Sequence, residues 1–117
     1  MLAGLAIVET LGRLEVRILT NLTVMNAAAV CAAVLSAWED RGRPQRLVVD
    51  LAGAKHIDSS GVGALLEIAH RIEDAGVRLV LSGLSRPARR MLDRTGLDMV
   101  FQITEAGAPA VRDSFHG

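Results

Sequence analysis

The chain has 117 residues, of which 50% are hydrophobic and 22% are charged. This length fits one domain, residues 1–117, that can bury a core of its own, and the composition excludes a disordered chain. The 13 basic and 13 acidic residues give a formal net charge of zero, so we expect no nucleic-acid partner. The longest apolar-rich run, residues 27–37, is too short for direct membrane insertion. No signal peptide is recognised, and we expect a cytoplasmic protein.

Residues 5–19 are predicted to form a β-hairpin that opens the fold. Apolar residues alternate with other residues on either side of Gly12, which is a turn signal. Two later runs, residues 47–51 and 77–81, read as buried strands, the first of them apolar on both faces. A short strand is predicted over residues 100–103.

Residues 24–40 are predicted to form the first helix, which ends before Gly42 and Pro44. The expected buried stripe consists of Val24, Ala28, Cys31, Leu35 and Trp38, widened by Ala27, Val30 and Val34. Cys31, the only cysteine, is then explained as a small buried hydrophobe.

Two more helices alternate with the later strands. One follows a loop over residues 52–58 and stops near Gly76, and the next has Pro87 near its first turn and stops at Gly96. Loosely helical spacing over residues 105–115 predicts a fourth helix. Strands that alternate with helices through short turns predict an α/β fold, with a mixed, mostly parallel sheet of about five strands and about four helices.

One polar segment lies between the end of a central strand and the start of the second helix. It reads His56-Ile57-Asp58-Ser59-Ser60-Gly61-Val62-Gly63. Open α/β sheets place functional sites at such strand ends, and the N-terminus of a helix attracts anions. The alternative is that Asp58 or a serine only caps the helix, as residues of these types often do. The spacing leaves both interpretations open.

The same segment does not fit the common catalytic and ligand-binding motifs. The members of a Ser-His-acid triad converge in space, whereas His56, Asp58 and Ser59 are crowded within four residues. Gly61 and Gly63 lack the third glycine of a dinucleotide fingerprint. The three histidines share no metal-ligand spacing. We therefore expect no enzyme, no cofactor and no metal.

Four arginines decorate the third predicted helix, namely Arg86, Arg89, Arg90 and Arg94. The spacing of four residues between Arg86, Arg90 and Arg94, beside Asp93, favours a solvated outer face, and a contact with protein or RNA is the alternative.

The polar segment also belongs to a longer series of motifs. The series consists of Leu47-Val48-Val49-Asp50-Leu51, Ile57-Asp58-Ser59-Ser60-Gly61-Val62-Gly63-Ala64-Leu65, Leu79-Val80-Leu81-Ser82-Gly83, Pro87, Met91-Leu92, Thr95-Gly96-Leu97 and Phe101. Together these residues resemble a STAS domain of the anti-sigma factor antagonist type. The resemblance extends from Leu14 to the last predicted helix.

The resemblance implies a function without catalysis. In that family, the unphosphorylated protein binds an anti-sigma factor with serine kinase activity and so frees the sigma factor. Phosphorylation of the serine that follows the aspartate ends this binding. The motif places the phosphorylation on Ser59, and Asp58, Ser60 and Gly61 beside it in the partner-binding surface. A phosphatase is a further candidate partner, and we expect a monomer or weak dimer.

One loop departs from the family pattern. Family members usually carry acidic residues between the second strand and the first helix, where this chain has Thr20-Asn21-Leu22-Thr23. The resemblance thus places neutral Asn21 and Thr23 in the partner-binding surface. Because STAS domains also occur in anion carriers and beside lipid-transport ATPases, the alternatives are an accessory subunit of a membrane transporter or a component of a signalling scaffold.

Overall fold

The structure, a computed structural model, describes residues 4–104. Its sheet contains β1 (Leu5–Thr10), β2 (Arg13–Ile18), β3 (Arg46–Asp50), β4 (Leu79–Ser82) and β5 (Gln102–Thr104). Its helices are α1 (Ala27–Asp40), α2 (Ser59–Glu73) and α3 (Arg86–Thr95), and a 3-10 helix, η1 (Leu97–Met99), follows α3. The predicted α/β class is confirmed.

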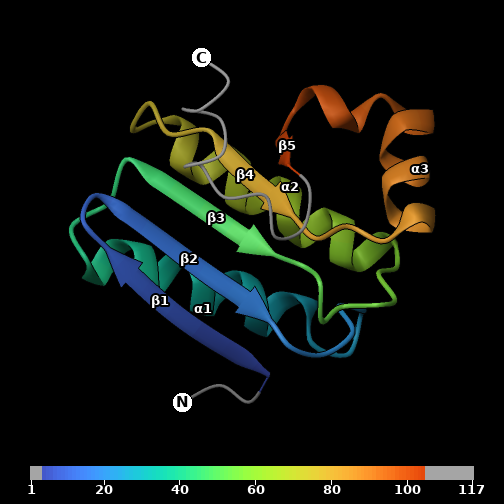
Figure 1. Ribbon diagram of the computed structural model, residues 1–117, viewed down its shortest axis with the longest axis horizontal. Coiled ribbons are helices and arrows are strands. Elements are labelled where there is room, and N and C mark those ends of the chain that lie inside the picture. The colour runs from blue at the N-terminus through green and yellow to red at the C-terminus, as the bar shows by residue number, and fades with distance from the viewer. Residues whose placement is uncertain (1–3, 105–117) are drawn as a thin grey trace, which may run out of the picture.

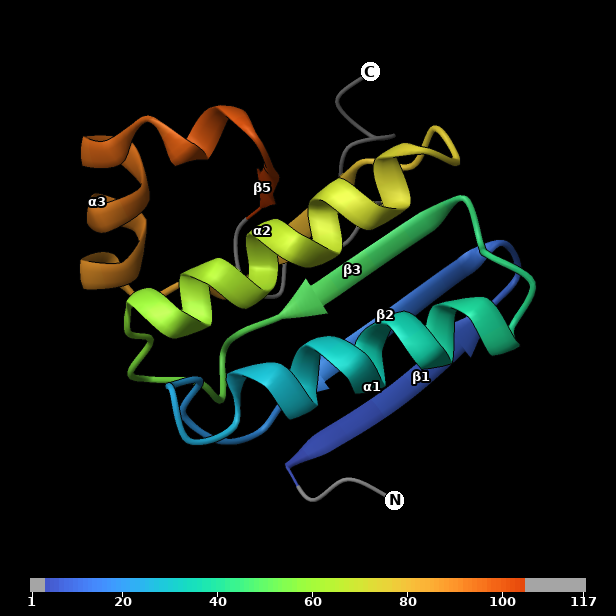
Figure 2. The same ribbon diagram turned by 180° about the vertical axis from the view of Figure 1, so that it is seen from behind.

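The five strands lie in the order β1-β2-β3-β4-β5. The hairpin pair β1 and β2 is antiparallel, with Gly12 at a φ of 72° in its turn, and every later pair is parallel. When each parallel strand is added on the same side of the last, right-handed crossovers place their helices on one face of the sheet. Figures 1 and 2 show this arrangement, in which α1 and α2 lie side by side over the same face of the sheet.

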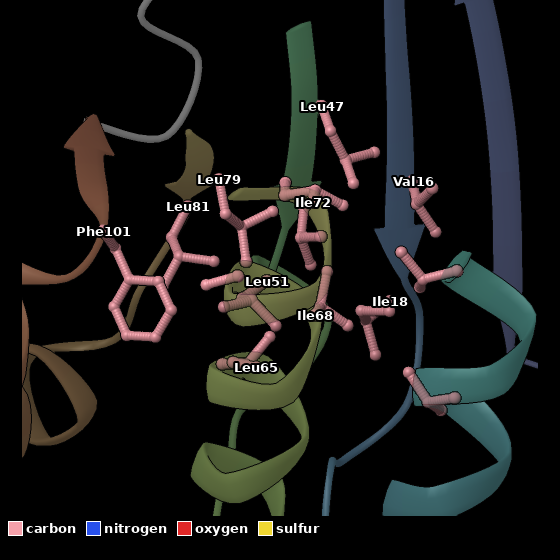
Figure 3. Close-up of a cluster of buried hydrophobic side chains, with 14 of the residues drawn as sticks. Val16, Ile18, Leu47, Leu51, Leu65, Ile68, Ile72, Leu79, Leu81 and Phe101 are labelled. Carbon is pink, nitrogen blue, oxygen red and sulfur yellow. The ribbon is translucent and has the colours of Figure 1, made fainter. Parts of the chain in front are cut away.

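The core lies between the sheet and these two helices. In β2 the alternate residues Leu14, Val16 and Ile18 are buried, as the period of two in a strand requires. Figure 3 shows how Ile68 and Ile72 of α2 lie among the apolar side chains of the strands. Among the described residues, no charged or polar residue is buried. The side chains of the core therefore pack mainly by apolar contact, and the charged and polar residues lie outside it.

The first helix differs from its prediction in its start and in its buried face. The helix begins at Ala27, and Val24 lies before it with 70% of its surface exposed. The buried residues of α1 are Ala27, Val30, Val34, Ala37 and Trp38. Ala28 is exposed, while Cys31 and Leu35 are half-buried, because the sheet contacts the helix along the neighbouring stripe. The prediction is confirmed for Ala27, Val30, Val34 and Trp38, whereas the other members of the predicted stripe, Val24, Ala28, Cys31 and Leu35, are exposed or only half-buried.

The later elements follow the prediction with small shifts. Gly96, which ends α3, has the left-handed φ of 77° that makes glycine favourable at the end of a helix. The strand predicted over residues 100–103 is present as β5, which begins two residues later and ends at Thr104. Phe101, which lies between η1 and β5, is buried. The helix predicted over residues 105–115 lies outside the described residues.

Candidate functional site

Three loops meet at the edge of the sheet where the parallel strands end. They connect β2 to α1, β3 to α2 and β4 to α3, and the Asp58-Ser59-Ser60-Gly61 motif stands at the junction of the second loop with α2. Because neighbouring parallel strands end at the same edge, loops far apart in the sequence lie side by side there. The sequence prediction placed a site at this edge.

Backbone hydrogen bonds join the first two loops. Leu22 and Ile57 form an isolated parallel bridge, in which the Leu22 N–H donates to the His56 carbonyl at 3.0 Å. The Asp58 N–H donates to the Leu22 carbonyl at 3.2 Å. The segment that precedes Ser59 is therefore fixed against the β2–α1 loop.

Three glycines allow the loops to approach this closely. A Cβ atom at Gly61 would overlap the carbonyl oxygen of Leu22, and one at Gly53 would lie 2.7 Å from the Ile18 carbonyl oxygen. A Cβ at Gly83, which has a φ of 73°, would lie 2.6 Å from the Ala52 nitrogen. The sequence prediction placed Gly61 in the partner-binding surface and missed its close approach to Leu22, as well as the roles of Gly53 and Gly83. Glycines that lie within a few residues of a strand end or in the first turn of a helix were the signal available for finding them.

Asp58 is the N-cap of α2, as the capping interpretation predicted. Its Oδ1 atom accepts from the Gly61 N–H at 2.9 Å, while Oδ2 accepts from the Val24 N–H at 3.0 Å. The backbone donors of Gly61 and Val24, in that order, lower the pKa of the Asp58 carboxyl below its ordinary value. Asp58 therefore does more than cap the helix, because the same carboxylate also holds the chain just before α1. Sequence reasoning missed Val24 as its second partner.

The two serines of the motif have different surroundings. Ser59 is the first residue of α2 and is exposed, whereas Ser60 is half-buried and faces α1 along a groove between the two helices. Of the two hydroxyl groups, that of Ser59 is thus the more accessible to an enzyme that modifies it.

Asn21 and Thr23, predicted to contact a partner, make internal hydrogen bonds. Asn21 Oδ1 accepts from the His56 N–H at 3.0 Å, and Thr23 Oγ1 accepts from the Met25 N–H at 3.3 Å. Asn26, which sequence reasoning missed, completes the loop, because its Oδ1 accepts from the Thr23 N–H at 3.0 Å. Asn21 is nevertheless exposed beside the motif, so its position suits a contact although its amide oxygen is already used.

The remaining polar candidates lie apart from this site. All four arginines of α3 are exposed, and Arg89 pairs with Asp93 at 3.1 Å.

Within residues 4–104, no group of three or more His, Cys, Asp and Glu side chains is arranged to hold a metal ion. No helix in the described part of the chain is both long enough and apolar enough to cross a membrane. His116 lies outside that part.

Solved structures with the same fold come from regulators and transporters. A Thermotoga maritima protein proposed to be an anti-sigma factor antagonist is 18% identical, with a TM-score of 0.82 over 97% of this chain and 95% of that one. The Bacillus cell fate determinant SpoIIAA in its phosphorylated form is 20% identical, with a TM-score of 0.70 over 95% of this chain and 98% of that one. The murine anion transporter Slc26a9 is 17% identical, with a TM-score of 0.75, and the match covers 93% of this chain and 18% of the transporter.

The sequence matches the family model described as the STAS domain over residues 5–110. The match includes every strand and helix described above and the Asp58-Ser59-Ser60-Gly61 motif between them. The chain belongs to the STAS domain family.

Proposed function

We propose that the chain is an anti-sigma factor antagonist that acts as a switch. In its unmodified form it binds an anti-sigma factor with serine kinase activity, and phosphorylation of Ser59 ends that binding. The observation that carries the proposal is the exposed Ser59 hydroxyl at the start of α2, on a loop held in place by Asp58 and Leu22. This hydroxyl is accessible to a kinase, and the fixed surface around it is accessible to a binding partner.

The charge of a phosphate explains how such a switch works. A phosphoserine carries roughly 1.5 to 2 negative charges at neutral pH, which the N-terminus of a helix tolerates. At an interface that closes around a neutral hydroxyl, the same charge and bulk oppose binding. The protein is then a substrate and a binder, so the proposal requires no catalytic group of its own. A phosphatase that restores the hydroxyl would reset the switch.

The site of modification is the first test. Serine kinases of the anti-sigma type from the source organism are incubated in turn with the chain and ATP, and the products are analysed by mass spectrometry. We expect phosphate on Ser59, no phosphate on a Ser59→Ala variant, and normal labelling of a Ser60→Ala variant, because Ser60 is half-buried against α1. Phosphate on Ser60 alone, or no kinase that labels the chain, would contradict the proposal.

A second candidate function is supported by the matches to transporters. Besides Slc26a9, the fold is similar to a sulfate transporter family protein of Wolinella succinogenes, at 22% identity and a TM-score of 0.67 over 82% of this chain. The chain would then be an accessory subunit of a membrane transporter. Co-purification with a transporter that is unchanged by Ser59→Asp would favour this second function, whereas loss of a kinase partner in the same variant would favour the first.

A further inference from the structure

A groove of about 800 Å³ runs between α1 and α2. The helices that border it contribute mainly small apolar side chains, among them Ala28, Cys31 and Ala32 from α1 and Ala64 from α2. The only charged residues that line it, Glu67 and Arg71, pair with each other at 3.1 Å. Among the described residues, the groove is therefore lined mainly by apolar side chains, and its two charged residues form an ion pair with each other.

One end of this groove is the candidate switch site. Ser60 of the motif and Val24 both line the groove, and the Val24 N–H is the group bound by the Asp58 carboxylate. Val24 is 70% exposed, and the next residue in the chain, Met25, is 89% exposed. Two large apolar side chains are therefore exposed to solvent in the segment that borders this end of the groove. A partner that covers Ser59 and enters the groove would contact Val24.

The shape of the groove favours a helix as its occupant. Both α1 and α2 follow neighbouring parallel strands, so the two helices run in the same direction (Figure 2). Side chains of both helices line the groove. From Ser60 to Arg71 the groove follows α2 over twelve residues, a rise of about 16 Å or about three helical turns. Small residues along such a groove let the ridge of a third helix approach closely.

The described part of a second copy does not supply such a ridge. In residues 4–104, the exposed large apolar residues are Ile7, Val8, Leu11, Leu19, Val24, Met25, Met99 and Val100, and none of them lies in α1, α2 or α3. The described helices therefore have no exposed apolar ridge that could enter the groove of another copy. Because the groove begins beside Ser60 of the candidate switch site, we expect its occupant to be the partner that contacts Ser59.

We propose that the α1–α2 groove receives an amphipathic helix of the same partner that contacts Ser59, with apolar side chains at a spacing of three and four residues along its buried face. This inference rests on the proposed function. It adds that the partner is held by a long apolar contact, at one end of which the phosphorylated serine lies. A phosphate on Ser59 then opposes binding of the nearer end of the partner's helix, while the rest of the groove is unchanged.

Two arginine substitutions on the same helix test the proposal. Ala32 and Ala29 are both exposed on α1, but only Ala32 lines the groove. The probe is the purified kinase that labels Ser59, and its affinity is measured by calorimetry. We expect Ala32→Arg to weaken binding at least about tenfold, because a long charged side chain would lie across an apolar contact, and Ala29→Arg to change it less than about twofold. Circular dichroism checks that both variants keep the wild-type fold.

The single cysteine provides a second readout. Cys31 is half-buried in the groove, and burial raises the pKa of its thiol, so alkylation is followed at mildly alkaline pH. We expect a bound partner to slow alkylation of Cys31 by about tenfold or more. Unchanged alkylation in the complex, or equal affinities of the two arginine variants, would overturn the groove proposal and leave the Ser59 switch intact. If no kinase labels or binds the wild-type chain, the proposed function fails, and the groove inference fails with it.

Discussion

Asp58 joins two parts of the chain that are 34 residues apart in sequence, because one carboxylate accepts hydrogen bonds from Gly61 and Val24. These hydrogen bonds favour the ionised form, so the pKa of Asp58 in the folded protein lies below its ordinary value. A group with a depressed folded pKa stabilises the fold fully above its unfolded pKa, which is about 3.9 for aspartate. Its contribution is lost as the pH falls through the folded pKa.

An Asp58→Ala variant is therefore expected to be less stable than the wild type at pH 7, and the difference should narrow below about pH 4. Urea denaturation of both proteins between pH 7 and pH 3 measures this change. An Asp58→Asn variant keeps one acceptor oxygen without the charge. Its free energy of unfolding at pH 7 should therefore lie between those of the wild type and Asp58→Ala. A difference between wild type and Asp58→Ala that stays constant over this pH range would mean that the ionised carboxylate is not the stabilising form.

At the scale of elements, the packing of α2 against the β2–α1 loop depends on a glycine. A Cβ atom at Gly61 would overlap the Leu22 carbonyl oxygen, which is itself hydrogen-bonded to the Asp58 N–H. Two residues further along the same helix, a Cβ at Gly63 would meet no atom within 4 Å. The two glycines thus provide a matched pair in which only the contact differs.

Gly61→Ala is expected to lower the free energy of unfolding by about 1–3 kcal/mol, because the helix or the loop must shift to relieve the overlap. Gly63→Ala should raise it by up to about 1 kcal/mol, since alanine favours a helix and the added methyl group enters open space. Chemical denaturation measures both changes. Equal effects of the two substitutions would show that helix propensity, and not the contact with Leu22, decides the stability at these positions.

At the scale of the whole molecule, the proposed switch requires that the charge at Ser59 changes binding without changing the fold. Ser59 is exposed at the N-terminus of α2, where a negative charge is stabilising by a few tenths to about 1 kcal/mol. Ser59→Asp should therefore keep the free energy of unfolding within about 1 kcal/mol of wild type and weaken binding of the partner kinase. Thermal denaturation and calorimetry measure the two effects. Unfolding of Ser59→Asp would mean that the serine is primarily structural.

Much of this architecture could be predicted from local patterns. The period of two around Gly12, the apolar run over residues 47–51 and the helix stop at Gly96 predicted their elements, because each signal depends on nearby residues alone. The start of α1 was harder to predict from the sequence. Val24 fits a helical pattern, but the hydrogen bond between its N–H and Asp58 holds it in the preceding turn.

The sequence by itself determined the α/β class, the mixed sheet and the position of the motif at the start of α2. Only the tertiary structure decided which stripe of α1 faces the sheet, because stripes one residue apart are similarly apolar in this alanine-rich helix. It also decided that Asn21 bonds to His56, that Gly61 packs on Leu22 and that the α1–α2 groove opens beside Ser60. These contacts join residues that are distant in sequence, and no local pattern of hydrophobicity or spacing encodes them.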